Sequence, residues 1–188
     1  HDICTVSEEW LDTDCDMDGL TNGEETSGLD DPDTTADPNG NTTDPQDEDT
    51  DGDGVTDGQE AIDMTDPNDV CDYDVASQDI TTVEDTWNDA DCDNDGLTNE
   101  EEVTGVDDPD TTADPNGNTT DPLDIDTDGD GVTDGQEAID MTDPNDSCDL
   151  ELTSQTETPD SEWNNIDCDN DGLTNGEETT GVDDPDTT

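Results

Sequence analysis

Apolar side chains stand singly along this chain, and Asp, Thr, Asn and Gly fill most positions between them. No apolar run is long enough for a signal peptide or a membrane span. Nine of the ten prolines follow Asp, and the residue before a proline is pushed out of the helical region. The pattern predicts extended and turning backbone with little or no β-sheet. Helix is expected only for about one turn at a time, for example over 58–63, ending at Gly28, Gly105 and Gly181 or at the next Asp-Pro pair.

The chain repeats itself. Residues 14–69 and 91–146 align without a gap and match at 49 of 56 positions, and a third copy begins at Asp167. Repeats of this length indicate a linear assembly in which each unit contacts mainly its neighbours, so we expect an elongated rod. The expected divisions are the end of a preceding spacer (1–13), a first repeat unit (14–69), a spacer (70–90), a second unit (91–146), a spacer (147–166) and the first part of a third unit (167–188). Because both ends fall inside a repeat, we interpret the chain as part of a longer array or as a subunit completed by its neighbours.

Five acidic loops of twelve residues lie within these repeats, beginning at Asp14, Asp49, Asp91, Asp126 and Asp167. Each has Asp at positions 1, 3 and 5, Gly at position 6, Asp or Asn at position 9 and Glu at position 12. This is the EF-hand spacing, which also uses the backbone carbonyl at position 7 and a bidentate acid at position 12 to give Ca²⁺ its six to eight oxygens. Five matches in register predict one ion in each loop, at least five per chain.

The expected ligands are Asp14, Asp16, Asp18, Leu20, Asn22 and Glu25 in the first loop, Asp49, Asp51, Asp53, Val55, Asp57 and Glu60 in the second, Asp91, Asp93, Asp95, Leu97, Asn99 and Glu102 in the third, Asp126, Asp128, Asp130, Val132, Asp134 and Glu137 in the fourth, and Asp167, Asp169, Asp171, Leu173, Asn175 and Glu178 in the fifth. Magnesium is disfavoured because it demands strict octahedral geometry and keeps its waters, and zinc prefers His or thiolate ligands.

Further aspartates lie beside the loops, and two interpretations of them stay open. They either complete a second ion or bridge neighbouring loops, or they cap turns, which is a common use of Asp. Four of them lie two residues before the first residue of a loop: Asp12, Asp47, Asp89 and Asp124. The other four belong to Asp-Pro pairs: Asp44, Asp66, Asp121 and Asp143.

The run from Asp126 to Glu137, followed by Thr142-Asp143-Pro144, resembles thrombospondin type 3 repeats. It is most similar to the bacterial form found in stalks of secreted and surface adhesins, common in Bacteroidota. The resemblance implies a calcium-wrapped, mostly irregular rod. Animal repeats of this type carry cysteine more densely, so their disulfide pattern does not transfer, and the Asp-Pro stretch between the loops is longer here.

The charge supports a cation-dependent fold. The chain has 63 acidic residues, no Lys or Arg and only 22% apolar residues, so neither internal cations nor a large core can offset carboxylate repulsion. The same lack of basic residues excludes nucleic-acid binding and attraction to anionic membranes, and no catalytic constellation is present, so we do not expect an enzyme.

The six cysteines predict disulfides and an extracellular setting. We expect each spacer to be tied to the loop that follows it, through the pairs Cys4–Cys15, Cys71–Cys92 and Cys148–Cys168. Trp10, Trp87 and Trp163 each precede a loop by four residues; they pack spacer on loop or, alternatively, bind a glycan or partner.

Together these features predict a secreted or cell-surface structural protein, a calcium-rigidified stalk or a filament formed by end-to-end self-association. Two alternatives remain, a dockerin-like calcium-dependent interaction module and an acidic calcium buffer or mineral-binding protein.

Overall fold

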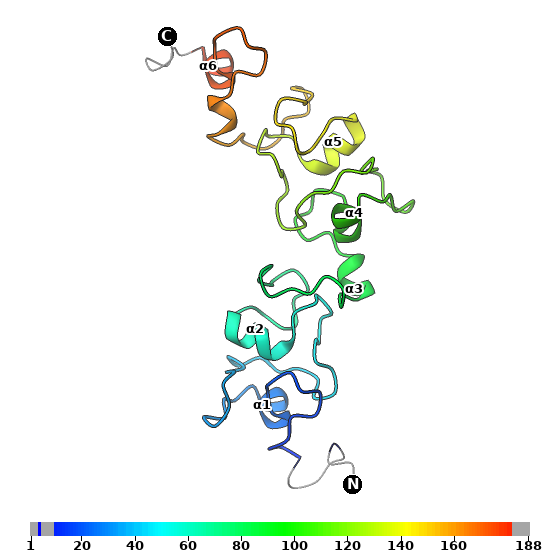
Figure 1. The fold of residues 1–188 in the computed structure, drawn as a ribbon, viewed down its shortest axis with the longest axis vertical. Helices are drawn as coiled ribbons and strands as arrows, with labels where there is room; N and C mark the ends of the chain where they lie inside the picture. The colour runs from blue at the N-terminus through cyan, green and yellow to red at the C-terminus, as the bar shows by residue number, and fades with distance from the viewer. Residues whose placement is uncertain (1–3, 5–9, 182–188) are drawn as a thin grey trace. The chain divides into compact units, whose positions relative to one another are not determined.

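The computed structural model describes residue 4 and residues 10–181, which fall into two compact units divided between residues 90 and 91. In each unit, short helices are connected by long irregular loops (Figure 1). No strand occurs among the described residues. The predicted fold class, a mostly irregular repeat array with short helices, is therefore confirmed.

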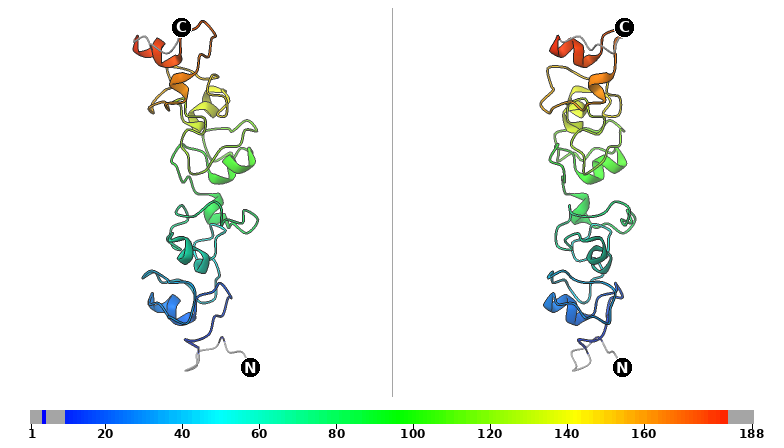
Figure 2. Two further views of the ribbon diagram at one scale, coloured as in Figure 1. Left: turned by 60° about the vertical axis from the view of Figure 1, so that its left-hand side comes forward. Right: turned by 90° about the vertical axis from the view of Figure 1, so that its left-hand side faces the viewer.

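The helices of the first unit are α1 (Asn22–Ser27), α2 (Asp57–Asp63) and α3 (Asp85–Asn88). The second unit contains α4 (Asn99–Thr104), α5 (Asp134–Asp140), the 3₁₀-helix η1 (Trp163–Asn165) and α6 (Asn175–Thr180). None of these helices is long and apolar enough to cross a membrane. The two views in Figure 2 show each helix as a short coil inserted between loops. The short helices α3 and η1 lie in the spacers, where no helix was predicted.

The loop helices begin at loop position 9, directly after a threonine at position 8. The hydroxyl of this threonine caps α1, α4, α5 and α6, whereas Thr56 before α2 makes no side-chain capping hydrogen bond. In α1, α4 and α6 the threonine hydroxyl accepts the N–H of the glutamate at position 11, whose carboxylate in turn accepts the threonine N–H. These three helices end at left-handed glycines, as predicted: Gly28, Gly105 and Gly181. The helices α2 and α5 end instead at left-handed methionines, Met64 and Met141, just before the next Asp-Pro pair.

The apolar core of each unit is only a few side chains. Leu20 of the first loop, Ala36 of the Asp-Pro stretch and Ala61 of α2 form one buried cluster. Leu97, Ala113 and Ala138 form the equivalent cluster in the second unit. The Asp-Pro stretch thus crosses between the two loops of its unit and places one alanine between them.

A buried glutamate fixes the start of this stretch. Glu24 accepts four hydrogen bonds: from the N–H and hydroxyl of Thr21 at 2.8 and 2.9 Å, from the N–H of Asp31 at 3.0 Å and from the hydroxyl of Thr34 at 2.6 Å. Burial acts to raise the pKa of Glu24, but these hydrogen bonds outweigh it and the pKa is lowered. Glu24 is therefore a charged structural anchor.

Candidate metal centres

Each acidic loop is a tight turn whose backbone needs left-handed residues at two places. Position 6 is glycine in all five loops, with φ between +89° at Gly54 and +108° at Gly19. Position 4 is also left-handed, with φ of +81° at Gly52 and +67° at Asn94. Glycine and asparagine tolerate this conformation best, so the sequences of the second to fifth loops favour the turn before any ligand is bound. The first loop has Met17 at position 4, with φ of +72°.

Backbone N–H groups hold the aspartates in place. In the second loop Asp49 accepts from the N–H of Gly52 and of Gly54, each at 2.9 Å. Asp53 uses one oxygen to accept the N–H of Val55 at 2.8 Å. The fourth loop repeats the arrangement, with Asp126 accepting from Gly129 and Gly131 at 2.9 and 2.7 Å. These bonds occupy some carboxylate oxygens and direct the others inward.

The inward oxygens are buried without hydrogen-bond partners. In the second loop these are Oδ2 of Asp51, Oδ2 of Asp53 and Oε2 of Glu60. Oxygens of Asp49, Asp51 and Asp53 lie within 4.8 Å of one another. Since a buried polar atom normally has a partner, and a carboxylate oxygen needs one most, these atoms fit a hard cation with oxygen ligands. The matching unpartnered oxygens in the other loops belong to Asp16, Glu25, Asp93, Glu102, Asp128, Asp130 and Glu137.

Burial together with neighbouring carboxylates perturbs these groups strongly. Burial, and then the charges of Asp51 and Asp53, raises the pKa of Glu60 to about 9. Glu102 has the same causes, burial followed by Asp93 and Asp95, and its pKa is also raised to about 9. Without a cation these carboxyls favour the protonated state near neutral pH, whereas a bound divalent ion would favour the carboxylates.

A threonine outside the loop orients the glutamate at position 12. The hydroxyl of Thr65 donates to Oε1 of Glu60 at 3.3 Å, and the hydroxyl of Thr142 donates to Oε1 of Glu137 at 3.0 Å. These threonines begin the Thr-Asp-Pro runs that follow α2 and α5. They hold one glutamate oxygen and leave Oε2 free to face the loop.

Position 9 has a structural contact that the sequence did not predict. Asp57 accepts the N–H of Thr50, at loop position 2, at 2.8 Å and its hydroxyl at 2.7 Å. Asn99 accepts the N–H of Cys92 in the same way at 3.3 Å. The oxygen at position 9 therefore closes these loops onto position 2. In the first loop Asn22 reaches position 2 only through its amide nitrogen, which donates to Sγ of Cys15 at 3.4 Å, and its buried Oδ1 has no hydrogen-bond partner. The role of position 9 as a ligand of its own loop stays a prediction.

The fifth loop has the same backbone but is more open. Its Asp167 accepts the N–H of Gly172 at 3.0 Å, as the equivalent aspartates do. Its Glu178 is exposed, whereas the glutamates at position 12 of the other four loops are buried.

The Asp-Pro aspartates adopt turns. Asp44, Asp66, Asp121 and Asp143 each accept the N–H of the residue two positions further on, at 3.1 to 3.3 Å. This is the turn-capping alternative. Asp12, Asp47, Asp89 and Asp124 are exposed. Metal binding by these eight residues stays a prediction.

Disulfides and tryptophans attach the spacers to the loops. The predicted pairs Cys4–Cys15 and Cys148–Cys168 are present, and Cys71 and Cys92 are also disulfide-bonded. The indole N–H of Trp163 donates to the carbonyl of Ser147 at 2.8 Å.

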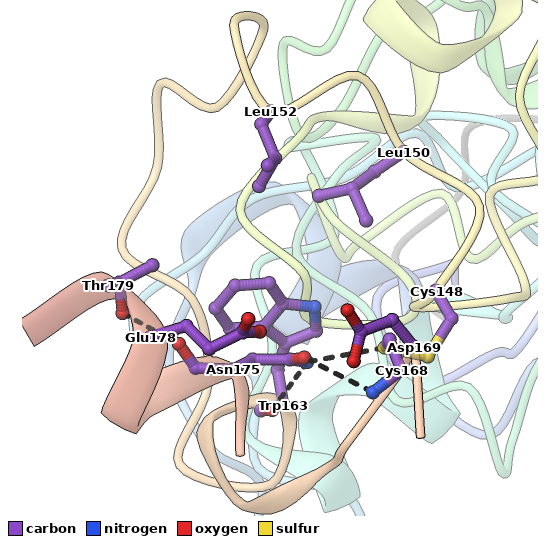
Figure 3. Close-up of a pocket in the computed structure, with 9 residues that line it drawn as sticks. All are labelled: Cys148, Leu150, Leu152, Trp163, Cys168, Asp169, Asn175, Glu178 and Thr179. Atoms are coloured by element: carbon purple, nitrogen blue, oxygen red, sulfur yellow. Dashed lines mark hydrogen bonds between the residues drawn. A yellow bond between two sulfur atoms is a disulfide. The ribbon is translucent and has the colours of Figure 1, made fainter. Parts of the chain in front are cut away.

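Trp163 lines a pocket of about 450 Å³ against α6. Leu150 and Leu152 of the spacer face it from one side, and Asn175 of α6 bonds to the Trp163 carbonyl at 3.0 Å (Figure 3). The predicted packing of spacer on loop is thus confirmed at this tryptophan.

The model of the bacterial TSP3 repeat matches the chain at residues 49–70, 91–105, 126–147 and 167–180. The chain carries bacterial TSP3 repeats. The matched segments contain four of the five acidic loops, and the first loop aligns with the third in sequence and in hydrogen bonding. TSP3 repeats are calcium-binding structural modules, and the clustered carboxylates described above fit that role. No curated protein and no solved structure is significantly similar to the chain.

Sequence reasoning missed two features of these TSP3 repeats. The glutamate at position 11 of the first and third loops, Glu24 and Glu101, was not singled out, although Thr at position 8 with Glu three residues later is a capping-box signal. The contact between the two loops of a unit, through Asp18 and Gly58, has no sequence signal because these residues are 40 positions apart.

Proposed function

We propose that this chain is an extracellular structural spacer whose repeats are ordered by bound calcium. The observation that carries the proposal is the set of buried carboxylate oxygens without partners, repeated in four loops of a chain that has no Lys or Arg. Calcium would neutralise these groups and replace the missing core, as metal does in small domains whose binding energy is folding energy.

The disulfides support the extracellular part of the proposal. All six cysteines are oxidised, which is usual outside the reducing cytosol. Extracellular calcium modules bind with dissociation constants of about 10⁻⁴–10⁻³ M, so order would follow the calcium level of that compartment.

The helices argue against a dockerin-like module. The longest, α2 and α5, have seven residues each, too short for an interaction helix of several turns. A simple calcium buffer would not need the repeated helix caps, or the threonine hydroxyls that orient the glutamates at position 12. An elongated stalk, or a filament of chains joined end to end, uses repeats that pack mainly on their neighbours.

Small-angle scattering with and without a chelator tests the proposal. In millimolar calcium we expect dimensions well above those of a sphere of the same mass, because a linear array of repeats that pack mainly on their neighbours would be elongated. After chelation the chain should expand towards coil dimensions while the disulfides stay closed. An unchanged radius of gyration would show that calcium does not order the chain.

Electron microscopy of the purified chain in millimolar calcium distinguishes the two forms of this function. Separate short rods indicate a stalk module, and long fibres that disappear on chelation indicate a self-assembling filament.

A further inference from the structure

One carboxylate cluster joins the two loops of a unit. Oxygens of Asp18 and Glu25 in the first loop and of Asp57 in the second lie within 4.8 Å of one another. Glu25 and Asp57 are fully buried. These residues occupy positions 5 and 12 of one loop and position 9 of the next, so neither loop alone provides the cluster.

Hydrogen bonds from several parts of the unit fix the three side chains. The N–H of Gly58 donates to Oδ2 of Asp18 at 2.8 Å, which brings the start of α2 against the first loop. Thr50 holds both oxygens of Asp57, and Thr43 donates to Oε1 of Glu25 at 3.4 Å. Oε2 of Glu25 is buried and has no hydrogen-bond partner.

The residue type at position 9 also points to a shared cation. Closing the loop onto position 2 does not require a charge, because Asn99 and Asn175 accept the backbone N–H of position 2 with an amide oxygen. Asp57 accepts the hydroxyl of Thr50 in addition to its N–H. Yet both second loops have Asp there, Asp57 and Asp134, and in the first unit this side chain lies against two carboxylates of the preceding loop. A third buried negative charge at that point only increases repulsion unless a cation is shared.

The second unit has the same parts. Asp134 is held by the N–H and hydroxyl of Thr127, at 2.9 and 2.6 Å, and Gly135 donates to Oδ2 of Asp95. Oε2 of Glu102 is again buried without a partner.

We propose that each unit binds an additional calcium ion between its two loops, beyond the ions inside them. The ligands are Asp18, Glu25 and Asp57 in the first unit and Asp95, Glu102 and Asp134 in the second. The proposal rests on the proposed calcium-dependent function. All the ligand atoms are carboxylate oxygens, which suit a hard divalent cation. A carboxylate has enough lone pairs to bind a loop ion and the shared ion at the same time. The shared ion would couple the two loops, so that they order together.

Counting bound calcium by equilibrium dialysis in millimolar calcium tests the shared site. The variants are Asp57→Asn, Asp134→Asn and the pair together. Asparagine is the residue that the other loops have at this position. Its amide oxygen can still accept the backbone N–H of Thr50 or Thr127, and its amide NH2 can donate to the threonine hydroxyl, so the contact to position 2 is kept with one donor reversed while the ligand charge is lost. We expect seven ions in the unchanged chain (five in loops and two shared), six in each single variant and five in the double variant.

Asp33→Asn is the matched control, because it removes one exposed carboxylate outside the clusters and should leave the count unchanged. Circular dichroism in calcium should show the same helix content in all variants. An unchanged count in the double variant, or the loss of all ions of a unit from one substitution, would overturn the shared site. A total of two ions or fewer in the unchanged chain would instead contradict the calcium-binding function itself.

Discussion

The glutamate at position 12 decides the behaviour of a loop at the scale of single residues. Glu60 and Glu137 are buried, each with one oxygen bonded to a threonine and the other without a partner among carboxylates. Two unit charges 4 Å apart repel by about 4 kcal/mol at the effective dielectric constant of a protein surface. A carboxylate held in this place is unfavourable without a cation and favourable with one. Substituting this glutamate should therefore affect calcium binding by the loop more than substituting any other ligand.

Substituting this glutamate should weaken one loop selectively. Glu60→Gln keeps the shape and an oxygen for Thr65 but removes the charge, so calcium affinity at the second loop should fall by more than the roughly 10–100-fold typical of an outer-shell change. Thr65→Val removes only the hydroxyl that orients Glu60, so it should lower the calcium affinity of the second loop by about tenfold. Limited proteolysis across a calcium titration measures both, with new cleavage confined to about 47–69.

Glu100→Gln is the control for this pair, because Glu100 is an exposed helical glutamate and carries the same charge. Its proteolysis pattern should not change. Protection lost evenly along the chain in Glu60→Gln would contradict a repeat array whose units respond locally.

At the scale of elements, the two loops of a unit are held together where α2 begins. Gly58 is the second residue of α2, and a Cβ there would collide with the carbonyl oxygen of Asp18. Gly135 has the same relation to Asp95. The absence of a side chain therefore permits the close contact that brings Asp57 to the first loop.

Gly58→Ala should separate the loops. Overpacking of this kind costs about 1–3 kcal/mol, and we expect a lower thermal midpoint in saturating calcium and a weaker calcium response of the first unit. Glu100→Ala is a suitable control, since the third loop already has a side chain at the same position 10. Equal midpoints for Gly58→Ala and the unchanged chain would show that the loop contact contributes nothing to stability.

The loops were predictable from sequence because their determinants are local. Gly54 marks the left-handed turn, Thr21 marks a helix start and Gly28 marks a helix end, each within a few residues of what it controls. The path of the Asp-Pro stretch was not predictable, because it depends on Ala36 packing against α2 and on the bond from Thr34 to Glu24. Contacts between residues far apart in sequence leave no periodic pattern in a chain with so few apolar residues.

At the scale of the whole molecule, the buried carboxyls make stability depend on pH in opposite ways with and without calcium. Burial is the largest cause at each of these groups, with nearby carboxylates adding to it, and the pKa is raised to about 7 at Asp51 and Asp128, about 8 at Glu25 and Glu137 and about 9 at Glu60. A folded-state pKa above the unfolded value stabilises the fold below the unfolded pKa, and this stability is lost as the pH rises through the folded pKa. Calcium reverses the sign, because it binds the deprotonated groups and releases their protons.

The calcium-free chain should therefore be more compact at pH 5 than at pH 8.5, while the calcium-saturated chain should be stable at pH 8.5 and lose its ions as the pH falls. Scattering and circular dichroism from about pH 3 to about pH 10, in calcium-free buffer and in millimolar calcium, measure the two curves. The midpoint in calcium-free buffer identifies the cause. Exposed carboxyls titrate near pH 4, so expansion centred there would assign the effect to general repulsion among the 63 acidic residues. Expansion centred between pH 6 and 9 assigns it to the buried loop carboxyls, and Gln at positions 25, 60, 102 and 137 should then keep the calcium-free chain compact at higher pH.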